Sequence, residues 1–346
     1  MQTNTKTHFF DLLQVLRGVA AIMVVFHHSI GSLKYYHHIN YPFLNFIGSV
    51  GKFGVDFFFV LSGFIISFSA TEKYGTPNGI KNYFLNRIIR IYVPYLPIGI
   101  AMFLIYKLLP GYSNSDRSIS LLTSLTLLPD GKPALSVAWT LTFEVFFYLF
   151  FCISFVSKKT WNYFLLFWSA VIIYFNYIEI FPSNLQNSFF KIFLSTYNLE
   201  FILGYILACL INSKIKIKEA ILWFGLMIFS ALFIMLKLND RSYFNFDINL
   251  IFVCASFIII YLAIQYNKKL NKNALVMIIG NATYSIYLVH NPLQMAVIRL
   301  IPNINTKISI VISLLLVVTL SIGIGFLYSL YFEKKLITVF RNKLKI

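Results

Sequence analysis

The sequence predicts an all-α protein, a polytopic bundle of about ten transmembrane helices with both ends of the chain in the cytoplasm. Of the 346 residues, 58% are hydrophobic and only 12% are charged, which is about half the charged fraction of soluble domains. The apolar residues also form runs long enough to cross a bilayer. Helices are the natural spanning element, because lipid offers the backbone no hydrogen-bond partners.

Ten apolar stretches are the expected spans. The first is too long for the core of a signal peptide, and no small-residue cleavage site follows it, so we expect it to be retained. No extramembrane domain separates the stretches, so the whole chain, 1–346, is expected to be a single transmembrane domain without a fused extracytoplasmic domain. The stretches cover residues 11–31, 51–70, 91–109, 135–156, 161–178, 193–211, 219–237, 247–265, 275–299 and 307–331.

The basic residues between these stretches predict the orientation. The chain carries 29 Lys and Arg against 12 Asp and Glu, a net charge of +17. With the N-terminus inside, 18 of the basic residues fall in cytoplasmic segments and 10 outside, and Arg17 lies within the first span. This bias follows the positive-inside rule. In a soluble protein the same charge would suggest nucleic acid, but here the loops account for it and we expect no nucleic-acid partner.

Several kinds of site are missing from the sequence. Cys152, Cys209 and Cys254 are isolated within apolar runs, without metal-ligand or redox spacing, so we expect no metal site. The sequence has no glycine-rich phosphate loop, no HExxH motif and no nucleophile elbow. Serine hydrolase and metalloprotease chemistry are therefore unsupported.

Ionisable residues within the first span are the first candidates for function, because charge within a membrane is costly. Arg17 and His28 are eleven residues apart, which puts them within roughly 20° of each other around a helix and about 16 Å apart along it. His27 is rotated about 80° from Arg17. Arg17 and His28 can therefore line one groove at two depths. The alternative is a snorkelling arginine and a histidine bonded to a neighbouring helix.

The second span carries Asp56, which shares a helix face with Gly63. A buried carboxylate needs a cationic or hydrogen-bonding partner. Ser62 and Gly63 alone favour close helix packing.

Arg87 and Arg90 precede the third span, three residues apart on a shared helix face. Guanidinium groups bind phosphate through paired hydrogen bonds. An anchor at the cytoplasmic surface explains the pair equally well.

The fourth span opens with a polar stripe of Ser136, Thr140 and Glu144 at fourfold spacing. The apolar neighbours of Glu144 require that it be protonated or paired. The ninth span carries Tyr284 and His290, although its aromatic residues also suit a membrane interface.

Taken together, these motifs resemble the acyltransferase-3 family of integral membrane acyltransferases, in particular the stand-alone members that modify exopolysaccharide, capsule or lipopolysaccharide. They occur in the family's order over nearly the whole chain. The matching pieces are LRG (16–18) followed by His28, GVDFFFVLSGF (54–64), RIIRIYVP (87–94), WTLTFE (139–144), YSIYLVH (284–290) and YFE (331–333).

The resemblance implies transfer of an acyl group, commonly acetyl, from acyl-CoA to a carbohydrate hydroxyl at the bacterial cytoplasmic (inner) membrane. It implies essential roles for Arg17 and His28 and for the pair Arg87 and Arg90. The acceptor would be a glycan or a lipid-linked sugar, reached from within membrane lipid. Some relatives carry a fused extracytoplasmic domain that completes transfer, so a separate extracytoplasmic transferase partner is an open alternative to direct transfer.

The mechanism expected from these residues starts with the phosphates of acyl-CoA on Arg87 and Arg90. The pantetheine arm then passes Arg17, and His28 acts as general base or accepts the acyl group transiently. Glu144 or Asp56 would orient the imidazole. The motif residues Trp139, Tyr284 and His290 are expected to bind substrate.

Two other functions fit intramembrane charge. A transporter of lipid-linked sugars or small anions would line its path with such residues, although no inverted repeat is detectable. A structural membrane scaffold would tolerate substitution of single charged residues.

Overall fold

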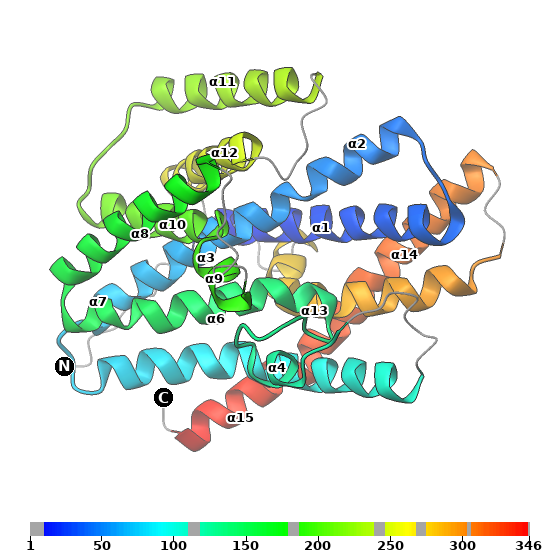
Figure 1. Ribbon diagram of the computed structural model, residues 1–346, viewed down its shortest axis with the longest axis horizontal. Helices are drawn as coiled ribbons and strands as arrows, with labels where there is room; N and C mark the ends of the chain where they lie inside the picture. The colour runs from blue at the N-terminus through cyan, green and yellow to red at the C-terminus, as the bar shows by residue number, and fades with distance from the viewer. Residues whose placement is uncertain are drawn as a thin grey trace.

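The computed structural model describes residues 10–109, 118–178, 187–238, 246–267, 275–302 and 306–344. Within these ranges the chain folds as a helical bundle (Figure 1), and the one β feature is an isolated bridge between Ile119 and Lys132. The all-α prediction is confirmed.

The bundle is built from long helices joined by short ones. The long helices are α1 (Asp11–His37), α3 (Phe53–Ala70), α4 (Gly79–Leu108), α6 (Trp139–Phe151), α8 (Lys158–Ile178), α10 (Tyr197–Asn212), α11 (Glu219–Leu238), α12 (Phe246–Gln265), α13 (Leu275–Leu300) and α14 (Lys307–Tyr328). The short elements are α2 (Pro42–Gly51), η1 (Thr71–Lys73), α5 (Leu121–Thr126), η3 (Ser136–Ala138), α7 (Ile153–Val156), α9 (Ser188–Phe193), η5 (Ser329–Glu333) and α15 (Lys334–Leu344).

Seven helical segments of the described chain are long and apolar enough to cross a membrane, counting α2 with α3 and α14 with α15 as continuous segments. The other three expected spans coincide with α8, α10 and α13, and α10 is an apolar helix of 16 residues. The protein is therefore a multi-pass membrane protein. The number of ten spans and the side on which each terminus lies stay predictions.

Reporter fusions test that topology. A fusion after Ile346 should report the cytoplasm, and a fusion within residues 111–118 should report the opposite side, because cytoplasmic loops retain most of the basic residues. Alkaline phosphatase and green fluorescent protein activities measure the two sides. Both fusions reporting the same side would contradict the ten-span topology.

Two helix pairs approach very closely where glycine removes the side chain. A Cβ at Gly63 of α3 would lie 2.2 Å from the carbonyl oxygen of Phe201 in α10, and one at Gly204 of α10 would lie 2.1 Å from that of Val60. A Cβ at Gly280 of α13 would lie 2.2 Å from the Gln14 carbonyl oxygen of α1. Small residues permit such backbone contact between membrane helices. α3 and α13 are thereby fixed against α10 and α1.

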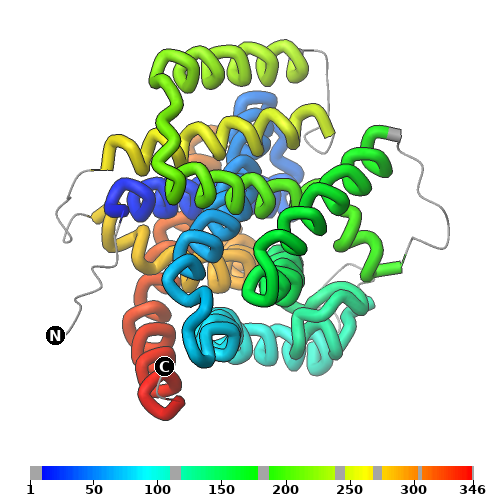
Figure 2. Tube along the Cα trace, turned by 90° about the vertical axis from the view of Figure 1, so that its left-hand side faces the viewer, coloured from blue at the N-terminus to red at the C-terminus, as the bar shows by residue number. Residues whose placement is uncertain are grey.

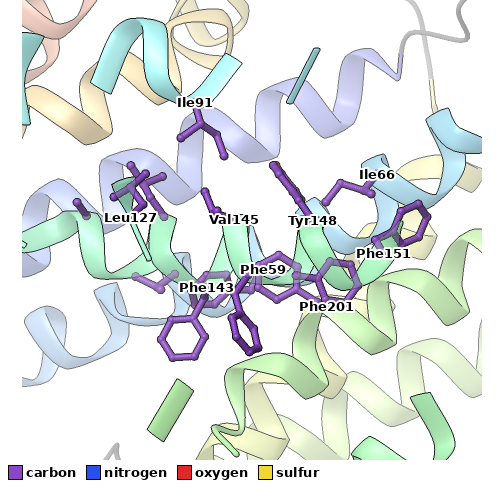
Figure 3. Packing of buried hydrophobic residues seen from close by; sticks show 14 of the residues in the cluster. Phe59, Ile66, Ile91, Leu127, Phe143, Val145, Tyr148, Phe151 and Phe201 are labelled. Atoms are coloured by element: carbon purple, nitrogen blue, oxygen red, sulfur yellow. The ribbon is translucent and has the colours of Figure 1, made fainter. Parts of the chain in front are cut away.

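An aromatic core lies between α3, α4, α6 and α10. Phe59, Phe143 and Phe201 are buried in it, and their rings meet at centroid distances of 5.0 to 6.0 Å (Figure 3). Such ring pairs stabilise a core beyond the area that they bury. By contrast, α11 lies at the edge of the bundle against α12 (Figure 2), and of its described side chains only that of Leu222 is buried. Its apolar surface therefore faces lipid.

Candidate active site

A cavity lies at the meeting point of α1, α3, α4, α6 and α13, and we call it the central cavity. It holds about 640 Å³ of empty space, part of it open to the surroundings. Its walls are largely apolar, with two arginines, one carboxylate and several hydroxyls. The lining residues are Arg17, Val55, Phe58, Phe59, Leu61, Ser62, Ile65, Arg90, Thr140, Leu141, Glu144, Thr283, Tyr284 and Tyr287.

Arg17 of α1 is held in place through α13. Its Nη1 donates to Gln14 Oε1 at 3.0 Å, and Gln14 Nε2 donates in turn to the Gly280 carbonyl and to Asn281 Oδ1, both at 2.8 Å. A guanidinium has five N–H donors. The donors of Arg17 that face the central cavity can therefore bind an anionic or polar ligand.

The two arginines of α4, Arg87 and Arg90, have different surroundings. Arg90 lines the central cavity with Arg17. Arg87 does not: it is buried, donates from Nη2 to Ser69 Oγ at 2.8 Å, and its guanidinium carbon lies 5.9 and 5.6 Å from the ring centroids of Tyr83 and Tyr148. Such stacking supplies cation–π attraction. In this structure the pair does not present two guanidinium groups to one cavity.

Glu144 has the partners that its apolar surroundings require. Ser62 Oγ of α3 donates to Glu144 Oε1 at 3.2 Å, and the Tyr148 hydroxyl donates to the same oxygen. Because the Tyr148 ring also packs on Arg87, these contacts connect Arg87 to the wall of the central cavity. Ser62 therefore does more than permit close packing.

The polar stripe of the fourth span faces α13. The Thr140 hydroxyl lies 2.7 Å from the Tyr287 hydroxyl, which also donates to the Val137 carbonyl at 2.9 Å, and Ser136 Oγ donates to Asn291 Oδ1 at 2.6 Å. Tyr287 lies seven residues further along α13 than Gly280, which Gln14 ties to Arg17, so these bonds lie away from Arg17 along the central cavity.

Two histidines, His290 and His28, lie next to Tyr287. The His290 ring packs on Tyr287 at 5.5 Å and on His28 at 5.2 Å, measured between centroids. Its Nδ1 lies 3.2 Å from the Ile286 carbonyl, and its buried Nε2 has no partner among the described residues. The His28 ring makes no hydrogen bond to any residue in the described ranges, so both of its nitrogens can serve a substrate.

His27 faces elsewhere, as the helical wheel predicts. Its Nδ1 lies 2.5 Å from the Gly48 carbonyl of α2, so the Nδ1–H donates there and ties α1 to α2. Its ring meets that of His28 edge-on at 4.9 Å. The sequence allowed a second role for a histidine of the first span, a hydrogen bond to a neighbouring helix. In the structure His27 makes such a bond.

Asp56 lies with two groups that the sequence analysis did not single out, Glu200 of α10 and Lys52. Asp56 and Glu200 are fully buried, and no described donor reaches their carboxyl oxygens. The two side chains lie within hydrogen-bonding reach of each other, so a proton on either one forms a carboxyl–carboxylate bond. Glu200 could have been found from the sequence, because it is the one acidic residue of the apolar stretch 193–211. Neither Asp56 nor Glu144 hydrogen-bonds to His28 in the described structure.

The remaining candidates differ in position. Tyr284 lines the central cavity, and its hydroxyl donates to the Ile91 carbonyl at 2.9 Å. Trp139 instead packs in the aromatic core, 5.1 Å from the Tyr197 ring and 5.8 Å from the Phe143 ring. It is not among the residues that line the central cavity.

The central cavity thus combines cationic groups with a histidine pair next to Tyr287. No curated protein and no solved structure matches the chain. A family model described as an acyltransferase domain matches residues 10–330, which is most of the chain. The chain therefore belongs to the acyltransferase-3 family, and it is a multi-pass membrane acyltransferase.

Proposed function

We propose that this acyltransferase moves an acetyl group from acetyl-CoA to a hydroxyl of a cell-surface glycan or of its lipid-linked precursor, in the bacterial cytoplasmic membrane. The observation that carries the proposal is the order of groups along the central cavity. Arg17 and Arg90 line the cavity, and Tyr287, which lies further along it from Arg17, contacts His290, which contacts His28.

The predicted topology gives this order a direction. α1 and α13 begin on the cytoplasmic side, so the arginine end faces the source of acyl-CoA. Arg17 and His28 are eleven residues apart, about 16 Å along the helix. The largely apolar central cavity beside Arg17 suits the long pantetheine arm. Arg90 and Arg17 would hold donor phosphate, and Glu144 would accept hydrogen bonds from the amide N–H groups of the arm.

His28 would carry the chemistry. In direct transfer its imidazole takes the proton of the acceptor hydroxyl while the oxygen attacks the thioester carbonyl. The C–S bond then breaks, and the departing thiolate takes the proton from His28. In a two-step route a His28 nitrogen attacks the thioester carbonyl, the C–S bond breaks and CoA leaves as the thiolate. The acceptor hydroxyl, or a nucleophile of a separate extracytoplasmic transferase, then attacks the acyl group and the bond to His28 breaks. Both routes require a His28 nitrogen that is not already bonded within the protein.

Release of free CoA tests the proposal. Purified protein with acetyl-CoA and surface glycan from the producing cell should release CoA and raise the mass of the glycan by that of an acetyl group less the hydrogen that it replaces. Arg90→Lys should raise the KM for acetyl-CoA about tenfold, because lysine keeps the charge but loses the paired hydrogen bonds. A transporter would consume no thioester.

Arg87→Lys is the matched comparison on the same helix. Arg87 contacts Ser69, Tyr83 and Tyr148 rather than the central cavity, so its replacement should lower thermal stability and leave the KM for acetyl-CoA within about threefold. Equal KM increases in the two variants would show that the pair binds donor jointly, through an arrangement different from the one described.

A further inference from the structure

A second cavity lies where the segment between α3 and α4 meets the junction of α6 and α7. We call it the inner pocket, because the predicted topology places this segment in the cytoplasm. It holds about 1420 Å³ of empty space, part of it open to the surroundings. The residues that line it are Lys73, Gly75, Thr76, Pro77, Asn78, Gly79, Ile80, Lys81, Phe84, Cys152 and Phe155.

A largely apolar groove adjoins the inner pocket and runs along α4 and α6, and we call it the α4–α6 groove. Phe84 lines both hollows, so they are neighbours. The groove holds about 570 Å³ of empty space, part of it open to the surroundings. Leu128 and Leu149 in its wall are each 41% exposed, so the groove opens toward lipid. The residues that line it are Phe84, Arg87, Ile88, Ile91, Tyr92, Thr126, Leu128, Val145, Tyr148 and Leu149.

The inner pocket is basic. Half-buried Lys73 and exposed Lys81 line it, and no lining residue is acidic. Arg87 of the adjoining groove and Arg341 of α15 lie close enough to Lys73 to repel it electrostatically, and Glu72 is the one acidic neighbour that attracts it. The positive-inside rule requires only that cytoplasmic segments be basic. It does not explain why like charges converge on one hollow despite their repulsion.

Arg87 makes this a built site rather than a patch of surface charge. Its side chain is only 8% exposed, and the rings of Tyr83 and Tyr148 pack on its guanidinium group. Among the described residues Ser69 accepts one hydrogen bond from it, and no carboxylate forms an ion pair with it. A guanidinium group has five N–H donors, and a buried cation needs an anionic partner. Arg87 is therefore poised to bind an anion that the protein itself does not supply.

We infer that the inner pocket and the α4–α6 groove together bind an anionic phospholipid of the cytoplasmic leaflet. Its phosphate pairs with Lys73, Lys81 and Arg87, and one acyl chain lies in the groove. An anionic amphiphile is complementary to both hollows at once. A soluble phosphate would leave the groove unfilled, and a zwitterionic lipid would leave the cations without a net counter-charge. The inference gives Arg87 a ligand outside the central cavity, and it does not depend on the proposed acetyl transfer.

Native mass spectrometry of the purified, delipidated protein in detergent tests the inference without requiring turnover. Three probes separate the contributions of charge and chain: dioleoyl phosphatidylglycerol, dioleoyl phosphatidylcholine, and glycerophosphoglycerol, which is the anionic head group without its chains. Phosphatidylglycerol should bind at least about fivefold more tightly than either of the others, because each basic residue near a lipid phosphate contributes roughly a factor of five.

Lys81→Glu reverses an exposed charge of the inner pocket, so the variant should fold normally and bind phosphatidylglycerol about fivefold or more weakly. Lys216→Glu is the control, because Lys216 is exposed on the same predicted side and lines neither hollow. It should leave binding within about twofold. Equal binding of the two lipids, or equal losses in the two variants, would overturn the inference. Displacement of the bound lipid by acetyl-CoA would also overturn it, by assigning these cations to the donor.

Discussion

Replacing His28 with alanine should abolish acylation while the protein still inserts and accumulates normally. A positioned general base contributes roughly 10²- to 10⁴-fold to rate, and a nearby imidazole cannot substitute when its geometry differs. His28 shares a helix face with Arg17, contacts His290 at 5.2 Å and keeps its ring nitrogens free of hydrogen bonds within the described structure. Glycan acylation at matched protein levels measures the loss.

His27→Ala is the natural comparison, because the two rings are neighbours. The His27 Nδ1–H already donates to the Gly48 carbonyl, which ties α1 to α2. Its loss should weaken the attachment of α2 while much of the turnover survives. Robust acylation by His28→Ala, or a loss of acylation confined to His27→Ala, would contradict the assignment of His28 as the catalytic histidine.

Gly63→Val should remove most of the folded protein from the membrane. Any Cβ at this position would lie 2.2 Å from the Phe201 carbonyl oxygen, which is backbone and cannot rotate away. Overpacking a tight contact usually costs about 1–3 kcal/mol, and a forced backbone shift costs more. α3 would have to separate from α10, and this would also disturb Ser62 and Asp56. Fluorescence-detected size-exclusion chromatography in detergent measures the folded yield.

Gly323→Val in α14 provides the control. A Cβ there meets no atom within 4 Å, so the same chemical change should leave the yield close to that of the wild type. A normal yield for Gly63→Val would mean that α3 and α10 are not packed as described. A loss in both variants would point to a general intolerance of substitution at helix glycines.

The helices could be predicted because hydropathy alone indicates where a chain can cross lipid, but their ends could not. The expected span 91–109 is the apolar part of α4, which begins twelve residues earlier at Gly79. The basic segment before Ile91 continues the same helix, and no apolar pattern marks it. Helix α2 was likewise not expected, because its residues Pro42–Gly51 lie, except for Gly51, between the predicted spans 11–31 and 51–70 and are too few to cross a membrane.

The sequence predicted which types of residue form the site, but it predicted less well which of them contact one another. Positions three apart on a helix share a face only broadly, with about 60° between them. That angle is enough to put Arg90 in the central cavity and Arg87 against Tyr83 and Tyr148. One partner of Glu144, Tyr148, lies one helical turn away, but the other, Ser62, is 82 residues away and no local pattern could identify it. The contact between His28 and His290 likewise forms only when α1 packs on α13.

The packed rings beside the central cavity have a consequence for the cell that houses this protein. The His290 ring contacts those of Tyr287 and His28, and the Tyr287 hydroxyl bonds to Thr140 of α6 and to Val137 of η3. A continuous water column there would let ions run down the membrane potential, each unit charge releasing about 2.3 kcal/mol per 100 mV. Packed rings oppose the formation of such a column. The acyl group could then be transferred as a covalently bonded group while the membrane potential is maintained.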